Sequence, residues 1–275
     1  MSTASIKRPP APPPANRTVT PRYKAEVTTG VIASSPKRVV VYGSGGIGKS
    51  ELASLLGNVG VKPLVLDLEG GTEHIDVARI KGISTFQECR DILHDEELCS
   101  DYQAIVIDTF TKAEEFIASH VVATIPHEKG HFVKNIGDYG FGKEMGHIYE
   151  QFLLLLSDLD AHVRKGRHVI GICHDCTANV PNPYGEDWLQ FQPRLQSPPS
   201  GKNSIRHRVR EWADYLLFIG YDTAVNKDGK ATGAGTRTIY PKEMPTHMAK
   251  SRGRLEDPIP YERGSADVWK LMFGT

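Results

Sequence analysis

The stretch Gly43-Ser44-Gly45-Gly46-Ile47-Gly48-Lys49-Ser50 decides the fold of this chain. It matches every fixed position of G-x-x-x-x-G-K-[ST], the pattern of a glycine-rich loop that holds phosphate groups. The run Arg38–Tyr42 before it is rich in β-branched residues and ends in an aromatic residue, which predicts a strand. Apolar residues at helical spacing follow the loop until Gly57, which predicts a helix over Lys49–Leu56.

The chemistry of this P-loop depends on its residue types. Glycines allow backbone N–H groups to turn around a phosphate without clashes from a Cβ atom. The following helix adds unpaired N–H groups and the positive end of its dipole. We expect Lys49 to reach the β- and γ-phosphates of a nucleotide and Ser50 to place its hydroxyl on Mg²⁺. The predicted nucleotide-binding segment runs from Gly43 to Glu51, and a glycine-rich turn that binds nothing is the alternative.

Composition makes several other classes of protein less compatible with this sequence. The 275 residues include 33 basic and 33 acidic side chains, so contact with nucleic acid would need a local basic patch. The four cysteines are unevenly spaced and do not predict a disulfide framework. The N-terminus lacks the apolar segment of a signal peptide, and the apolar run Phe152–Leu156 is too short to cross a membrane. We expect a cytoplasmic protein that makes no membrane contact.

Proline content divides the chain into two predicted regions. Residues 1–36 combine clustered prolines with scattered basic residues, so we expect an extended or disordered arm. This arm is either a solvated tail or a segment that docks on a neighbouring subunit or on DNA. Residues 37–275 have the length of one α/β domain.

Strand-like apolar runs alternate with helical patterns along residues 37–275. This alternation is typical of a mostly parallel sheet covered by helices, so we predict an α/β fold. The predicted strands are Arg38–Tyr42, Leu64–Asp67, Ala104–Asp108, His168–Cys173, Tyr215–Ile219 and Thr236–Tyr240. The predicted helices are Lys49–Leu56, Thr85–His94, Thr111–Val122 and Lys143–Arg164. Because ligands bind at the carboxyl ends of parallel strands, the residues that end each strand are the site candidates.

Two of these strand ends carry carboxylates. Leu64–Asp67 continues into Leu68 and Glu69, and Glu69 is our candidate for the group that orients and deprotonates an attacking water. This role requires the strand to lie near the P-loop strand, whereas for Asp67 we expect a solvated loop position. Ala104–Asp108 is a run of apolar residues ending in aspartate, the Walker B pattern, so Asp108 is expected to hold Mg²⁺ through its water shell.

The residue after Asp108 strengthens the assignment of Glu69. Many P-loop ATPases have a glutamate at that position, which acts as the base, but here it is Thr109. The base must therefore come from elsewhere in the chain.

The strand His168–Cys173 is followed by His174, which is our candidate for sensing the γ-phosphate by a hydrogen bond; an ordinary histidine without such a role is equally compatible. Cys173 and Cys176 flank His174 as a C-x-x-C pair. Zinc is disfavoured there because a structural site needs four ligands and no second pair lies nearby in the sequence.

The segment Asp175–Asn203 is rich in Pro, Asn, Gly and Ser and predicts a long loop, which in a compact domain is usually functional or disordered. Aromatic side chains for stacking on bases, next to cations for phosphates, are typical of a surface that binds single-stranded nucleic acid. A flexible loop followed by an exposed amphipathic helix is the alternative. The candidate DNA-binding residues are Tyr184, Trp188, Phe191, Lys202, Arg206, Arg208 and Arg210.

The last candidates lie beyond the predicted strand Thr236–Tyr240, which we expect to form part of a hairpin. Here Lys250 and Arg252 flank Ser251. They are too far along the chain to complete the site of their own subunit, and a solvated basic turn is the alternative.

Together these motifs resemble the RecA-like ATPase core, in the family's order, over roughly residues 37–260. Gly43–Ser50 matches its P-loop, Leu64–Glu69 looks like its second core strand with the catalytic glutamate, and Ala104–Asp108 matches its Walker B strand. Val169–His174 is similar to the strand whose last residue senses the γ-phosphate, although that residue is often Gln. Lys250-Ser251-Arg252 looks like the finger that RecA-like and DnaB-like assemblies insert into the next subunit's ATP site.

Within this group the chain is most similar to the short, core-only RecA-like proteins of bacteriophages that act in single-strand annealing and recombination. The similarity rests on Leu66–Gly71, Ile107–Thr109, the turn Asp138-Tyr139-Gly140 and the finger. The extra C-terminal domain of bacterial RecA has no counterpart here. The resemblance therefore implies annealing or coating of single-stranded DNA rather than autonomous strand exchange.

The resemblance implies an ATPase that uses ATP and Mg²⁺ between subunits of a homo-oligomer, a filament or a ring, and is stimulated by single-stranded DNA. Lys49, Glu69 and His174, with Lys250 and Arg252 of a neighbour, would act on the phosphates. A single-strand-binding protein is a partner implied by the family alone, and a phage-encoded protein would act in the bacterial host cytoplasm. A DnaB-like helicase motor, a nucleotide-gated assembly protein and a small-molecule kinase are the alternatives.

Overall fold

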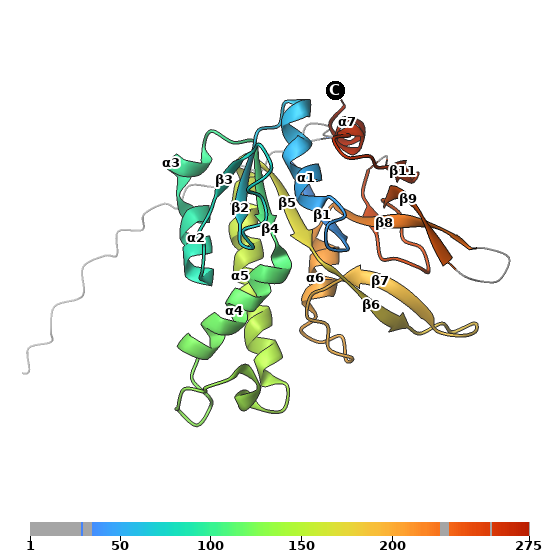
Figure 1. The fold of residues 1–275 in the computed structure, drawn as a ribbon. Coiled ribbons are helices and arrows are strands. Elements are labelled where there is room, and N and C mark those ends of the chain that lie inside the picture. The colour runs from blue at the N-terminus through green and yellow to red at the C-terminus, as the bar shows by residue number, and fades with distance from the viewer. Residues whose placement is uncertain (1–28, 30–34, 226–230, 254, 275) are drawn as a thin grey trace, which may run out of the picture. The chain divides into compact units, whose positions relative to one another are not determined.

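The computed structural model describes residues 29, 35–225, 231–253 and 255–274 (Figure 1). Apart from residues 29, 35 and 36, the predicted N-terminal arm lies outside the described residues and stays a prediction.

One central sheet organises the fold, with the strand order β11-β9-β8-β1-β5-β4-β2-β3 and β10 paired to β8. The strands β3, β2, β4, β5, β1 and β8 run parallel, whereas β9, β10 and β11 add antiparallel pairs at one edge. Their bounds are β1 Arg38–Gly43, β2 Pro63–Asp67, β3 Ala78–Ile80, β4 Ala104–Asp108, β5 His168–Cys173, β8 Tyr215–Val225, β9 Ala231–Tyr240, β10 Lys250–Ser251 and β11 Ile259–Pro260.

Helices cover both faces of this sheet. Side chains of α2, α4, α5 and α6 pack with one set of strand residues, including Val40 and Tyr42. Side chains of α1, η1 and α7 pack with the alternate set, including Val39 and Val41. The bounds are α1 Lys49–Ser54, η1 Leu55–Val59, α2 Phe86–His94, α3 Glu96–Cys99, α4 Phe110–Thr124, η2 Ile136–Tyr139, α5 Lys143–Arg164, α6 Ile205–Trp212 and α7 Asp267–Phe273.

The central strands are buried on both faces, which explains their continuous apolar sequences. Every residue of β2 and β4 is buried, as expected for parallel strands covered by helices on both sides. The polar residues Asp67 and Asp108 come only at the last position of each strand, where the sheet ends and a site can form.

A single residue, Thr109, connects the end of β4 to the start of α4. Thr109 caps α4, since its hydroxyl accepts a hydrogen bond from Lys112 N at 3.0 Å. Phe110 then packs against β5 at Gly171, where an added Cβ would lie 2.3 Å from the Phe110 ring. A residue larger than glycine at position 171 would push α4, and with it Thr109, away from the sheet.

The order and direction of the strands confirm the predicted α/β fold with a mostly parallel sheet. The predicted C-terminal hairpin is also confirmed, since β8 and β9 pair in antiparallel fashion. Three local predictions were wrong. The helix predicted over Lys49–Leu56 ends at Ser54 and continues as the 3₁₀ turn η1, and the strand predicted over Tyr215–Ile219 extends to Val225. The amphipathic helix considered as the alternative after residue 202 is confirmed as α6, with Ile205, Val209 and Trp212 buried and the polar residues His207, Arg208 and Glu211 exposed.

The third wrong prediction is the long loop over Asp175–Asn203. Asp175–Val180 (β6) and Trp188–Pro193 (β7) form an antiparallel hairpin with its own two-stranded sheet. Asparagine and proline cluster in its turn, where they favour chain reversal. Figure 1 shows this hairpin and β8–β9 projecting from the part of the sheet beside β1, away from α2 and α3.

No helix among the described residues combines the length and apolar character needed to cross a lipid bilayer.

Candidate active site

The P-loop is formed by the turn between β1 and α1. Gly48 precedes α1 with a φ of 107°, and a Cβ at this position would lie 2.8 Å from the Tyr261 hydroxyl. That hydroxyl donates to the Gly48 carbonyl at 2.8 Å, and Arg237 Nη1 donates to the Ile47 carbonyl at 2.8 Å. The C-terminal part of the chain therefore fixes the backbone of the P-loop from outside, a contact that the motif alone does not predict.

Lys49 is buried, with its ammonium inside the loop. Its Nζ donates to the carbonyls of Gly43 and Ser44 at 2.7 and 2.8 Å. Burial lowers the pKa of Lys49, and the carboxylates of Asp175 and Asp108 oppose this effect. The ammonium is thus held at the concave side of the loop, where a bound phosphate would replace the two carbonyls as its partner.

Ser50 and Asp108 supply the oxygen ligands that a magnesium ion prefers. Asp108 is buried at the end of β4, and the Ser50 hydroxyl acts to lower the pKa of its carboxyl. Burial, with the neighbouring carboxylates of Glu69 and Asp67, raises the pKa of Asp108 to about 6 despite this effect. A hydroxyl and a nearby carboxylate, surrounded by further acidic groups, fit a divalent cation that accompanies a nucleotide.

Asp67 is not the solvated residue that the sequence predicted, because it is buried and organises the turn after β2. Its carboxylate accepts hydrogen bonds from the backbone N–H groups of Gly70, Gly71 and Thr72 and from the Thr72 hydroxyl, at 2.6 to 3.2 Å. These bonds outweigh the effect of burial, so the pKa of Asp67 is lowered. The turn that carries Glu69 is therefore rigidly defined.

Glu69 reaches the site although β2 is not next to β1. Strands β4 and β5 lie between them, so the position of β2 alone does not bring Glu69 to the P-loop. The chain after β2 instead turns toward the end of β4, where Leu68 N donates to the Asp108 carbonyl at 2.8 Å. This turn brings the Glu69 carboxylate beside the residues that follow β4 and β5.

Glu69, Thr109 and His174 form one hydrogen-bonded group. The Thr109 hydroxyl donates to Glu69 Oε1 at 2.7 Å, and His174 Nε2 lies 3.0 Å from the same oxygen and 3.2 Å from Oε2. Because β5 lies directly between β1 and β4, His174 follows the strand that separates the P-loop strand from the strand that ends in Asp108. The order of strands thus brings the predicted base and the predicted sensor into contact, and adds Thr109, which the sequence had singled out only for not being a glutamate.

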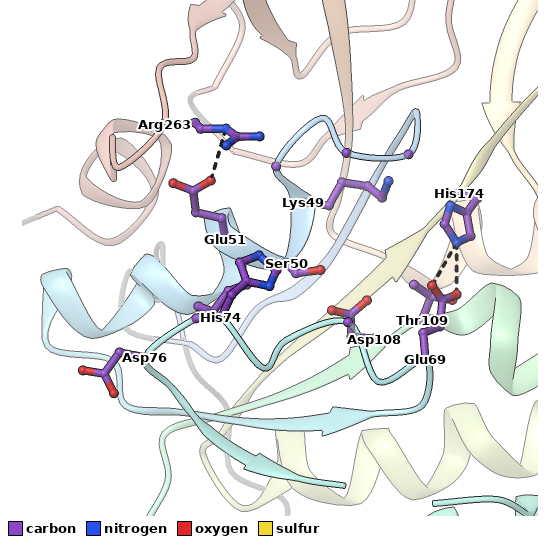
Figure 2. A pocket seen from close by; sticks show the side chains of 15 residues that line it. Lys49, Ser50, Glu51, Glu69, His74, Asp76, Asp108, Thr109, His174 and Arg263 are labelled. Atoms are coloured by element: carbon purple, nitrogen blue, oxygen red, sulfur yellow. Dashed lines mark hydrogen bonds and ion pairs between the residues drawn. The ribbon is translucent and has the colours of Figure 1, made fainter. Parts of the chain in front are cut away.

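These residues line a single pocket of about 540 Å³. Figure 2 shows Glu69, Thr109 and His174 gathered at one end of it, whereas Glu51 and Arg263 face each other at the other end, with an Arg263 Nε to Glu51 oxygen distance of 3.8 Å. The sequence analysis missed several lining residues because they follow no motif. Those residues are Thr109, His74, Ile75, Asp76 and Arg263.

Lys250, in β10, and Arg252, just after it, lie away from this pocket and bond the C-terminal end of α6 in their own chain. Lys250 Nζ donates to the carbonyls of Arg210, Glu211 and Ala213 at 2.6 to 2.9 Å. Arg252 pairs with Asp214 at 3.2 Å and donates to the Glu211 carbonyl at 3.2 Å. Both cations satisfy the exposed carbonyls at the C-terminus of a helix, a favourable position for positive charge.

Replacing Lys250 with methionine therefore tests its role. If the lysine mainly caps α6, the free energy of unfolding should fall by about 1–2 kcal/mol, because three carbonyls lose their donor. Chemical denaturation measures this, with Lys242→Met, a change at a nearby exposed lysine, as the control. An unchanged free energy of unfolding combined with lost ATP turnover would instead assign Lys250 to a neighbouring subunit's site.

The candidate DNA-binding residues do not form one surface. Trp188 shares a face of the hairpin with Gln190 and Gln192, whereas Phe191 and Leu189 point to the opposite face, as the strand register requires. Phe191 stacks on Phe218, with ring centres 5.2 Å apart. The single patch predicted from the sequence is therefore divided between two faces.

All three predicted DNA-binding arginines have partners, Arg208 only through an exposed pair with Glu211 at 3.9 Å. Arg206 donates to the carbonyls of Pro193 and Leu195 and to Gln192 Oε1, so it anchors the base of the hairpin rather than facing solvent. Arg210 forms an ion pair with Glu243. Tyr184, in the hairpin turn, is 97% exposed, and Lys202 and Arg208 are also exposed. These last residues, with Trp188, remain the candidates for contact with DNA.

Cys173 and Cys176 lie in different environments. Cys173 is completely buried in β5, which raises the pKa of its thiol. Cys176 lies in β6 next to Arg206, whose Nη2 is 3.4 Å from the sulfur. Among the described residues, no group of three or more His, Cys, Asp or Glu side chains is arranged to hold a metal ion.

A phosphate-binding loop between strand and helix, a buried aspartate facing its serine, and a glutamate opposite them define a P-loop nucleotide hydrolase site. The chain belongs to the AAA domain family, which matches residues 35–253. The protein is an ATPase.

The other comparisons add little to this assignment. No curated protein matches the chain. Among solved structures, a KaiC-like protein from the hyperthermophilic archaeon Pyrococcus horikoshii is similar in 83% of this chain and 86% of its own, with 13% identity and a TM-score of 0.42.

Proposed function

We propose that the protein is an ATP-dependent, single-stranded DNA-binding ATPase of the kind that acts in phage recombination and annealing. The observation that carries this proposal is the position of the β6–β7 hairpin. It begins at Asp175, directly after His174, and Ser44 of the P-loop donates to Asp175 Oδ2 at 3.2 Å. A long projecting hairpin with exposed aromatic residues is thus bonded to the phosphate-binding loop itself.

In the proposed reaction, Lys49 neutralises charge on the β- and γ-phosphates and the P-loop N–H groups hold them in place. Mg²⁺, bound by Ser50 and through water by Asp108, would neutralise further phosphate charge. Glu69 orients the attacking water and accepts its proton. His174 contacts the carboxylate of Glu69 at 3.0 Å, and in this proposal it bonds a terminal phosphate oxygen and reports whether that phosphate is present.

The opposite end of the pocket suits the rest of the nucleotide. His74, Ile75, Asp76 and Arg263 line the pocket near Ser50 and Glu51. Figure 2 shows Arg263 beside Glu51 and His74 beside Ser50. A flat base can lie between an imidazole or aliphatic side chain and a guanidinium group, which stacks on aromatic rings. We assign the base and ribose of ATP to this end.

Contact with DNA is assigned to the hairpin turn and to the exposed cations near α6. Tyr184 and Trp188 offer rings for stacking on bases, and Lys202 and Arg208 offer charges for phosphates. In a homo-oligomer, a filament or a ring, these hairpins would line one continuous path. A single-strand-binding protein is the partner that the family resemblance supports.

The double variant Tyr184→Ala/Trp188→Ala tests this assignment. Loss of stacking costs about 1–3 kcal/mol per base, so affinity for an oligothymidine should fall by at least tenfold. Leu189→Ala is the matched control, since Leu189 is exposed on the other face of the same hairpin. Fluorescence anisotropy of a labelled oligonucleotide measures the affinity. Equal binding by the wild type and the double variant would contradict the assignment of DNA to this turn.

A nucleotide-gated assembly protein is a second candidate, favoured by the engagement of Lys250 and Arg252 within their own chain. ATP would then stabilise contacts between subunits without a role for DNA. In that case ATP would change the sedimentation of the protein whether or not DNA is present, and the Tyr184→Ala/Trp188→Ala variant would assemble as the wild type does.

A further inference from the structure

Asp175 is the first residue of the β6–β7 hairpin. It contacts Ser44 of the P-loop and acts electrostatically on Lys49. Its carboxylate accepts a hydrogen bond from the Ser44 hydroxyl at 3.2 Å. The carbonyl of the same Ser44 accepts from Lys49 Nζ at 2.8 Å. Among the charged neighbours of Lys49, the Asp175 carboxylate has the largest effect on its pKa, ahead of Asp108, although burial dominates. Asp175 is therefore a negative charge placed beside the phosphate-binding loop.

A triphosphate brings more negative charge into the same small space. Like charges a few ångströms apart in a partly buried site repel strongly, because solvent screens them less than it screens exposed charges. Lys49 can form its closest contacts with the phosphates or with the groups that now hold it, but not with all of them. The nucleotide and Asp175 therefore compete for the same side of the P-loop.

The base of the hairpin is fastened on its other side to α4, independently of the P-loop. His174 N donates to the Thr111 hydroxyl at 3.1 Å, Arg194 N donates to the His174 carbonyl at 2.8 Å, and Gln196 N donates to the Glu114 carboxylate at 2.9 Å. Loss of the Ser44–Asp175 bond would thus free the start of β6, whereas β7 stays attached through Phe191, whose carbonyl accepts from the Tyr42 hydroxyl at 3.0 Å and from Met248 N at 2.9 Å. This geometry is that of a hinged segment.

We propose that Asp175 holds the hairpin against the P-loop when no triphosphate is bound, and that the β- and γ-phosphates displace its carboxylate and release that side of the hairpin. Asp175 acts as a positioning residue, because it works through Ser44 and Lys49. The proposal rests on the P-loop as the ATP site and adds to it a mechanism by which phosphate charge reaches the hairpin.

The variant Asp175→Asn separates charge from shape. Asparagine keeps an oxygen that can accept from Ser44, but it removes the negative charge. The variant should bind ATP about tenfold more tightly than the wild type, whereas affinity for AMP, which lacks the β- and γ-phosphates, should change less than about twofold. The gain should shrink as salt is raised, because screening weakens the repulsion. Glu186→Gln removes a charge from the turn of the same hairpin and should leave both affinities as in the wild type.

Hydrogen exchange of the backbone over residues 175–193 provides a second reading in the absence of DNA. In the wild type, a non-hydrolysable ATP analogue should speed exchange at the start of β6. In Asp175→Asn, exchange there should be the same with and without the analogue, because the phosphates do not repel the neutral amide. Equal effects of Asp175→Asn on ATP and AMP affinity, or exchange that still responds to the analogue in this variant, would overturn the proposal.

The failure of the ATP site itself would look different. If Lys49→Ala bound ATP as well as the wild type does, the P-loop assignment would fail whatever Asp175→Asn did. If Lys49→Ala lost binding and Asp175→Asn behaved as the wild type, only the role of Asp175 would be rejected.

Discussion

Lys49→Ala should abolish detectable ATP binding and with it all ATP turnover. The ammonium of Lys49 is buried at the concave side of the P-loop, where the phosphates of the nucleotide are predicted to bind. In such a partly buried site a charge-assisted contact to a phosphate contributes several times more than an exposed ion pair. We expect affinity to fall by at least about a hundredfold, a change of roughly 2.8 kcal/mol.

Isothermal titration with ATP and Mg²⁺ measures this loss. Lys49 also holds the carbonyls of Gly43 and Ser44, so the fold of the variant must be compared with the wild type by thermal unfolding. Lys129→Ala, at an exposed loop position, is the control for removal of a lysine. A folded Lys49→Ala protein that hydrolyses ATP at the wild-type rate would contradict the assignment of the site.

Glu69→Gln should keep ATP binding and lose hydrolysis. Glutamine preserves the shape of the side chain and can still accept from the Thr109 hydroxyl, as Glu69 does at 2.7 Å. It cannot accept a proton from water, so kcat should fall by about 10²- to 10⁴-fold, the range for removal of a general base. The affinity for ATP should change little, because the carboxylate lies opposite the P-loop.

Single-turnover hydrolysis measures the effect on chemistry separately from product release. Glu73→Gln is the matched control, since Glu73 lies on the same segment but pairs with Lys81 at the surface. Unchanged turnover in Glu69→Gln would mean that another group activates the water. Loss of ATP binding in this variant would assign Glu69 to the nucleotide rather than to the water.

The sequence was sufficient to predict the parts of the fold that depend on local patterns. The P-loop, the apolar strands β1, β2, β4 and β5, and the amphipathic helix α5 all carry strong periodic signals, and α5 has the predicted bounds Lys143–Arg164. The ends of these strands also marked Glu69, Asp108 and His174 as candidates, because the carboxyl edge of a parallel sheet is where polar residues follow apolar runs.

Contacts between distant segments could not be predicted in this way. Gly48 is fixed by Tyr261 through a hydrogen bond that spans most of the chain, and Arg263 enters the pocket from a segment without a motif. The hairpin β6–β7 was hidden because its half-exposed strands lack a continuous apolar run, and its turn is rich in residues that also signal loops. Arg206 looked like a surface cation because sequence shows charge but not the carbonyls that surround it.

The rate of ATP hydrolysis by the purified protein, with and without single-stranded DNA, tests the central claim most directly. The connection of the P-loop to the hairpin through Ser44 and Asp175 predicts that DNA increases the rate by at least tenfold and that the Tyr184→Ala/Trp188→Ala variant loses this increase. A rate that is the same with and without DNA would leave an ATPase site in place and contradict the proposal that this site serves DNA.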